Sequence, residues 1–225
     1  MKAGIPSEPG HSQFAGRISQ LQDELSAQDP GIVANRSGAT FRAINSTQGE
    51  ILLPIWQQSA VLSFPGLVGR DLRTGQELPV AFQALLLYYL KTADGAPLSR
   101  HWISFSELPN GKFYNQAYQG YTGKELGRAF QGDLDGFVRV AQNSGGRLEP
   151  NNSPQTPGDK ACSFLALPRV SLLVAAWSGD EDFPASFQIL FDASVSHYLP
   201  TDVCAILGSM LTKRLIAGAA SSPSC

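Results

Sequence analysis

The sequence predicts an α+β fold, in which antiparallel sheets pack against helices in one domain that has room for two lobes. Most short β-prone runs fall into two groups, one before residue 65 and one after residue 160, with one more run at 101–107. The segments around them carry apolar residues three and four apart, which is the spacing of amphipathic helices. Because strands and helices are segregated, a sheet packed with helices is favoured. The 225 residues, 43% of them hydrophobic, suffice for one substantial core or two small packed lobes.

The N-terminal part is expected to hold one helix and then a small sheet. Residues 1–16 are rich in Pro, Gly and Ser and are predicted to be a disordered lead. Residues 17–27 have helical spacing, and Asp29-Pro30-Gly31 is expected to end that helix. Pro54 predicts that its own strand lies at an edge or stops there. The strand-like runs are residues 39–44, 50–56 and 60–64.

The middle of the chain is predicted to be mostly helical. Its clearest helix covers residues 77–92, with a wide apolar stripe that ends at Ala93-Asp94-Gly95. Residues 113–121 fit either a helix or an irregular loop. Residues 143–160 are rich in Asn, Gly, Pro and Ser, and form a long loop that is the candidate boundary between two lobes. The other expected elements are a strand at 101–107 and short helices at 123–130 and 134–142.

The C-terminal part is predicted to return to strands and to end in a long helix. A tight acidic turn joins the second and third of its strands. The last helix, residues 201–217, has Thr201 as its expected N-cap and a buried apolar stripe that includes Ile206 and Met210. The single α+β domain is thus expected to span residues 17–217, followed by a flexible tail at 218–225. The remaining predicted elements are strands at 163–167, 170–177 and 186–191 and a short helix at 193–198.

Composition excludes several classes of function. The formal net charge is -2 and the basic residues are scattered, so no nucleic-acid partner is indicated. No apolar run reaches the roughly 20 residues that a bilayer requires, and none resembles a signal peptide. We therefore expect a cytoplasmic protein without a membrane partner. The cysteines Cys162, Cys204 and Cys225 match neither a disulfide framework nor an iron–sulfur site, and the first two are expected to be reduced core residues.

The acidic turn is the candidate ligand site of the sequence. It contributes Asp180, Glu181 and Asp182, with Asp192 at the end of the next strand and His197 beyond it. Asp180 and Asp182 can point to the same side, and with His197 they form a candidate metal site. The simpler interpretation, which we favour, is turn chemistry, because aspartate side chains commonly accept hydrogen bonds from backbone amides two residues on.

An aromatic segment is the second candidate site. Tyr114 and Tyr118, with Phe113 and Tyr121 beside them, are candidates to line a pocket for a flat ligand, or else they fill the core. Motifs for an activated nucleophile and for a nucleotide phosphate are missing from the sequence. The sequence therefore assigns no catalytic residue and identifies no cofactor.

A long ordered string of motifs resembles one known family. The string includes Trp102-Ile103-Ser104-Phe105-Ser106-Glu107-Leu108-Pro109, Leu167-Pro168-Arg169-Val170, Trp177-Ser178-Gly179-Asp180-Glu181-Asp182-Phe183-Pro184-Ala185 and Leu190-Phe191-Asp192. It resembles the uncharacterised prokaryotic family named domain of unknown function 3786, over roughly residues 31–215. Some members of that family are fused to small iron–sulfur modules of the kind found beside corrinoid proteins. Since this chain has no cysteine cluster, the resemblance implies an iron–sulfur or corrinoid partner that carries the cofactor itself.

Three functions are compatible with these observations. The first is a binding or accessory protein for a small ligand, metal or cofactor, or for the assembly of a cofactor-containing (iron–sulfur, corrinoid or tetrapyrrole) partner. The second is a small-molecule enzyme that uses Asp180, Glu181 or Asp182 as acid, base or metal ligand. The third is a purely structural protein-interaction domain whose acidic turn is a feature of the surface.

Overall fold

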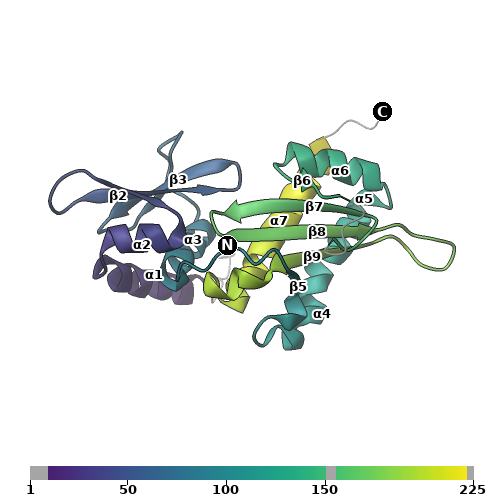
Figure 1. The fold of residues 1–225 in the computed structure, drawn as a ribbon, viewed down its shortest axis with the longest axis horizontal. Coiled ribbons are helices and arrows are strands. Elements are labelled where there is room, and N and C mark those ends of the chain that lie inside the picture. The colour runs from purple at the N-terminus through teal and green to yellow at the C-terminus, as the bar shows by residue number, and fades with distance from the viewer. Residues whose placement is uncertain (1–9, 151–155, 222–225) are drawn as a thin grey trace, which may run out of the picture.

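The computed structural model describes residues 10–150 and 156–221, and it confirms the α+β architecture with two antiparallel sheets (Figure 1). The first sheet is a meander of four strands in the order β1-β2-β3-β4. The prediction that the strand containing Pro54 lies at an edge or stops there was wrong, because β2 is an inner strand that continues to Ile55. Pro54 is tolerated because it lies two residues beyond the last β2 residue that pairs with β1, so that side of the strand is open. The strands are β1 (Thr40–Ala43), β2 (Gly49–Ile55), β3 (Gln58–Phe64) and β4 (Gly69–Asp71).

Helices α1 (Gly10–Ser26), α2 (Pro30–Ser37) and α3 (Val80–Thr92) pack with this sheet and with one another (Figure 1). The prediction of a disordered lead was wrong for residues 10–16, which belong to α1; residues 1–9 lie outside the described residues.

Helix α2 was not predicted, because Asp29-Pro30 was interpreted only as the end of α1. The same pair also starts α2. The Asp29 side chain accepts hydrogen bonds from the Gly31 and Ile32 amides at 2.8 and 3.0 Å, and Pro30 occupies the first helical turn. A strong N-cap therefore begins a new helix at the residue after the break.

The second sheet has five strands in the order β5-β9-β8-β7-β6, all antiparallel. Alternate residues point to opposite faces. The face covered by helices carries the main core, including Phe164, Val174 and Ile189. The other face, called here the outer face, carries a small cluster of Ala161, Leu173 and Leu190 beneath Trp102. The strands are β5 (Trp102–Ser104), β6 (Arg147–Leu148), β7 (Lys160–Leu167), β8 (Val170–Trp177) and β9 (Ser186–Asp192).

Helix α7 (Thr201–Ser221) runs behind the second sheet in Figure 1, and the other helices of this half surround it. Leu207, Leu211 and Leu215 of α7 are fully buried. The segment at 113–121, which fitted helix or loop, is helical. These elements are η1 (Phe105–Glu107), α4 (Gly111–Tyr121), α5 (Gly123–Phe130), α6 (Leu134–Asn143) and η2 (Ala193–His197), where η marks a 3₁₀ turn.

By length and composition, α7 is the one helix of the described residues that would suffice to cross a membrane. The central helix of a water-exposed protein meets the same criterion, and the buried leucines of α7 show that it serves as a core helix here. The helix extends to Ser221, four residues into the tail that was expected to be flexible, and residues 222–225 lie outside the described part.

The two sheets share one hydrophobic core, whose buried residues come from both. The Trp56 amide at the end of β2 donates a hydrogen bond to the Ala166 carbonyl of β7, at 2.8 Å. The chain changes from one sheet to the other between β4 and β5, with α3 in between, whereas the 143–160 segment connects elements of the second sheet only.

Candidate functional site

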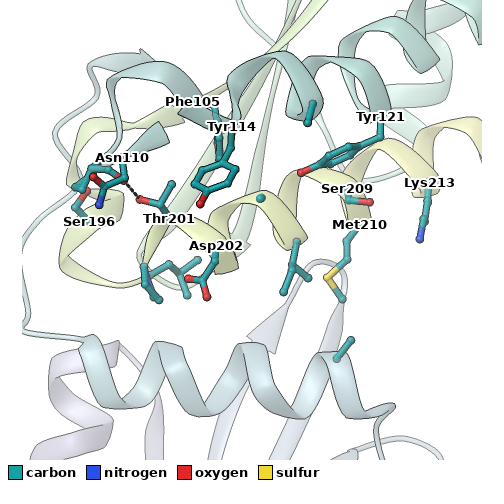
Figure 2. A pocket seen from close by; sticks show the side chains of 17 residues that line it. Phe105, Asn110, Tyr114, Tyr121, Ser196, Thr201, Asp202, Ser209, Met210 and Lys213 are labelled. Carbon is teal, nitrogen blue, oxygen red and sulfur yellow. Dashed lines mark hydrogen bonds between the residues drawn. The ribbon is translucent and has the colours of Figure 1, made fainter. Parts of the chain in front are cut away.

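A large groove lies between α4 and α7, with Ala81 of α3 on its far side (Figure 2). Its volume is about 1180 Å³, which is at or above the size of typical small-molecule sites. Most of its lining is apolar. The residues that line it are Ala81, Phe105, Pro109, Asn110, Tyr114, Ala117, Tyr121, Ser196, Leu199, Pro200, Thr201, Asp202, Ala205, Ile206, Ser209, Met210 and Lys213.

Helix α4 supplies the aromatic wall. Tyr114, Ala117 and Tyr121 are three and four residues apart, so they share one helical face, and this face looks onto the groove. Tyr114 is 66% exposed and Tyr121 is 43% exposed, which are high values for aromatic side chains. Partial burial raises the pKa of the Tyr121 hydroxyl, so that hydroxyl stays protonated at neutral pH. Tyr114, a candidate of the sequence, thus lies on the wall of the groove.

Helix α7 supplies the floor. Thr201, Asp202, Ala205, Ile206, Ser209, Met210 and Lys213 follow its axis in a stripe that spans three turns. At about 1.5 Å of rise per residue, Asp202 and Lys213 are separated by roughly 16 Å along the axis. The groove thus has a carboxylate towards one end and an ammonium towards the other, with Ile206 and Met210 between them, as Figure 2 shows for its labelled residues.

Tyr118 lies beneath the groove and not in it. Its ring stacks on Phe105 with centroids 4.1 Å apart, and its side chain is fully buried. A Cβ atom at Gly208 of α7 would lie 2.3 Å from the Tyr118 hydroxyl, so this glycine permits the close contact between α4 and α7. Within the described part of the chain the hydroxyl has no hydrogen-bond partner, and burial raises the pKa of Tyr118 well above its ordinary value. Tyr118 is therefore a core residue that supports the groove from below.

The acidic hairpin follows the pattern of turn chemistry. The Asp180 carboxylate accepts hydrogen bonds from the Asp182 and Phe183 amides at 2.9 and 2.7 Å, and the Asp180 amide donates to the Phe183 carbonyl. Asp180, Glu181 and Asp182 are all exposed. The one hydrogen-bonding carboxylate of the turn is thus used to hold the turn itself.

Asp192 is a buried structural carboxylate with a side chain only 2% exposed. Its oxygens accept hydrogen bonds from five donors: the amides of Ser99, Arg100 and Ser194 and the hydroxyls of Ser99 and Ser194. Burial alone would raise the pKa of Asp192, but the hydrogen bonds from Ser194 and Ser99 outweigh it and lower the pKa. Asp192 therefore caps η2 and fixes the chain before β5.

His197 pairs with a residue that the sequence did not indicate. Its Nδ1 lies 2.6 Å from Oδ2 of Asp94, which directly follows α3, and both side chains are about half exposed. The hydrogen bond from His197 lowers the pKa of Asp94. Asp192 and His197 lie at the end of β9 opposite the hairpin, and seven strand residues of about 3.3 Å separate the two ends by roughly 20 Å. Within the described residues, Asp180, Asp182 and His197 do not converge, and no group of three potential metal ligands occurs.

The groove residues on α7 were only partly anticipated by the sequence. Ile206 and Met210 were expected in the buried stripe of this helix, but they are half-buried and line the groove instead. The signal was present in the composition of the helix, since its apolar positions cover more of the circumference than one core-facing stripe needs. Lys213 could not be identified, because a Lys-Arg pair on a helix is ordinary.

Fold and groove together define a two-sheet α+β protein with an open apolar groove beside its central helix. The chain belongs to a family described as Domain of unknown function (DUF3786), whose model matches residues 29–214. This confirms the resemblance found in the sequence. No match was found among curated proteins or among solved structures.

Proposed function

We propose that this protein is a binding protein and that its groove receives an amphipathic helix of a partner protein. The observation that carries the proposal is the shape and chemistry of the groove: an apolar channel along three turns of α7, with Asp202 and Lys213 separated along its length. An amphipathic helix that lays its apolar face in a groove is a common mode of peptide recognition.

The dimensions favour a helix over a small flat ligand. The stripe from Thr201 to Lys213 corresponds to about 18 Å, the length of a helix of roughly 12 residues. Exposed aromatic side chains are enriched at protein interfaces, and Phe113 is 84% exposed on the same helix as Tyr114. A partner helix with a basic residue opposite Asp202 and an acidic residue opposite Lys213 would be oriented by these two charges.

The other functions have less support. The exposed acidic hairpin uses its hydrogen-bonding carboxylate within the turn, which does not favour an enzyme that works through Asp180, Glu181 or Asp182. An iron–sulfur or corrinoid protein remains the partner that the family resemblance implies, and a cofactor carried by that partner is consistent with a groove that binds protein. The expected cytoplasmic location agrees with such a partner.

Site-specific crosslinking in the native host tests the proposal. A photoreactive phenylalanine derivative would replace Tyr114 in the groove or, as the control, Ile32, which is 52% exposed on α2. We expect Tyr114 to crosslink to one amphipathic segment of one protein, and Ile32 not to do so. Met210→Glu should abolish the crosslink at Tyr114, because an unpaired carboxylate in an apolar interface destabilises the complex, whereas Ile32→Glu should not.

Two results would overturn the proposal. One is a crosslinking pattern that is the same at Tyr114 and at Ile32. The other is a small molecule that copurifies with the wild-type protein in native mass spectrometry and is lost in Met210→Glu.

A further inference from the structure

A second, polar hollow of about 510 Å³ lies on the outer face of the second sheet, away from α7. It is within the range of small-molecule sites. Ser163 of β7, Ser171 of β8 and Trp102 of β5 come from alternate strand positions that share this face. The groove and this hollow are thus separated by the sheet itself.

The two carboxylates at this hollow are already occupied by donors of the protein. Asp192 holds the five donors described above. Glu149 accepts two hydrogen bonds from the Arg147 guanidinium, at 2.8 and 3.2 Å, and one from the Ser163 hydroxyl. Neither carboxylate therefore has much remaining capacity for a cationic ligand.

Three residues that line the hollow have side chains that can donate hydrogen bonds and that have no partner among the described residues. They are Arg100, Ser171 and Trp102, none of whose side chains makes a hydrogen bond or ion pair there. A guanidinium offers a planar fork of N–H groups that matches carboxylate and phosphate oxygens, and an indole offers one N–H beside a flat apolar face. A ligand that satisfies them must be rich in acceptors.

The backbone at Arg100 is held in an unfavourable conformation. Its φ is 60°, in the left-handed region that non-glycine residues seldom adopt. The Arg100 amide donates to Oδ2 of the buried Asp192 at 2.7 Å, and this bond fixes the strained residue in place. Strained residues held by the surrounding structure occur preferentially at functional sites.

We propose that this hollow binds a small organic anion, whose carboxylate or phosphate oxygens pair with Arg100 and whose flat body lies against Trp102. Ser171 donates a further hydrogen bond to the same oxyanion. The hollow shares no lining residue with the groove, because it lies on the opposite face of the sheet.

Calorimetric titration of the full chain with benzoate and with phenyl phosphate tests this proposal, with benzamide as the neutral probe of the same shape. We expect saturable binding of at least one anion with a Kd below about 1 mM, and the tighter probe tells whether the natural oxyanion is a carboxylate or a phosphate. Arg100→Gln should weaken that binding about tenfold or more, whereas Arg73→Gln, at an exposed arginine of the turn after β4, should leave it unchanged.

Arg100→Gly separates binding from folding, because glycine adopts a φ of 60° without strain. This variant should be as stable as the wild type in urea, or more stable, and should still lose binding. The proposal is overturned if neither anion binds saturably, if benzamide binds as tightly as benzoate, or if the Arg100 variants bind the anion like the wild type.

Discussion

Asn in place of Asp192 is the substitution with the best-defined structural consequence. The carboxylate accepts five hydrogen bonds in the native protein, and the Arg100 amide is 2.7 Å from Oδ2. In Asp192→Asn, the amide nitrogen would face the Arg100 N–H, so one partly buried donor would lose its acceptor. The remaining donors would bond to a neutral oxygen instead of a charged one.

The expected loss can be estimated from these bonds. A hydrogen bond to a charged group contributes about 1.5–3 kcal/mol, and a stranded buried donor costs a similar amount. Weakening of the other four bonds brings the expected loss in the free energy of unfolding to about 3 kcal/mol. Urea denaturation at pH 7, analysed with a common m-value, measures this difference.

Asp180→Asn is the matched control. Asp180 also accepts hydrogen bonds from two backbone amides, but its side chain is exposed. The free energy of unfolding of Asp180→Asn should therefore fall by no more than about 0.5 kcal/mol. A loss below about 1 kcal/mol for Asp192→Asn, or equal losses for both variants, would refute the assignment of Asp192 as the buried anchor.

The pH dependence provides a second check on the same residue. The pKa of Asp192 is lower in the folded state than in the unfolded state. The ionised carboxylate therefore contributes fully to the free energy of unfolding above the unfolded-state pKa of about 4, and this contribution is lost as the pH falls through the folded-state pKa. The difference in stability between wild type and Asp192→Asn should therefore be constant near neutral pH and should shrink below about pH 4.

Three further outcomes are expected. Gly208→Ala should destabilise the protein by about 1–3 kcal/mol in urea, because the added Cβ would overlap the Tyr118 ring. Tyr118→Phe should be neutral or stabilising, because it removes a buried hydroxyl that has no partner among the described residues. A destabilising Tyr118→Phe would show that the hydroxyl is hydrogen-bonded. The triple variant Asp180→Asn/Glu181→Gln/Asp182→Asn should have the same thermal unfolding midpoint as the wild type, both with and without added Mg²⁺ or Mn²⁺. A rise in the midpoint of the wild type alone when metal is added would indicate a metal site in the hairpin. In a Cys225→Ser background, Cys162 and Cys204 should not react with a thiol reagent at pH 8 until urea is added. Burial raises the pKa of the Cys162 thiol to about 12, and it also raises the pKa of the Cys204 thiol. Rapid labelling in the native state would contradict their burial.

Much of the fold could be predicted because local patterns specify it. Gly123–Phe130 and Val170–Trp177 have the bounds that the sequence indicated, since glycines and a tight turn mark their ends. Helix α2 was missed because Asp29-Pro30 carries two signals at once, the end of one helix and the N-cap of the next. The start of α1 was missed because Gly10 lies in a polar stretch with no apolar periodicity.

The candidate sites were harder to predict because their residues meet only in the folded chain. Asp192 was identified as a candidate from its place after a strand, but its partners Ser99 and Arg100 lie more than ninety residues earlier. The predicted group of Asp180, Asp182 and His197 assumed that neighbours in sequence are neighbours in space. A strand of seven residues between them places them at opposite ends of the sheet.

Asp192 also links the two proposed sites. On the outer face its carboxylate accepts a hydrogen bond from the amide of Arg100, a residue that lines the polar hollow. On the other side it caps η2 through the Ser194 amide and hydroxyl, and Ser196 at the end of this turn lines the groove. One buried carboxylate thus positions a wall of each site.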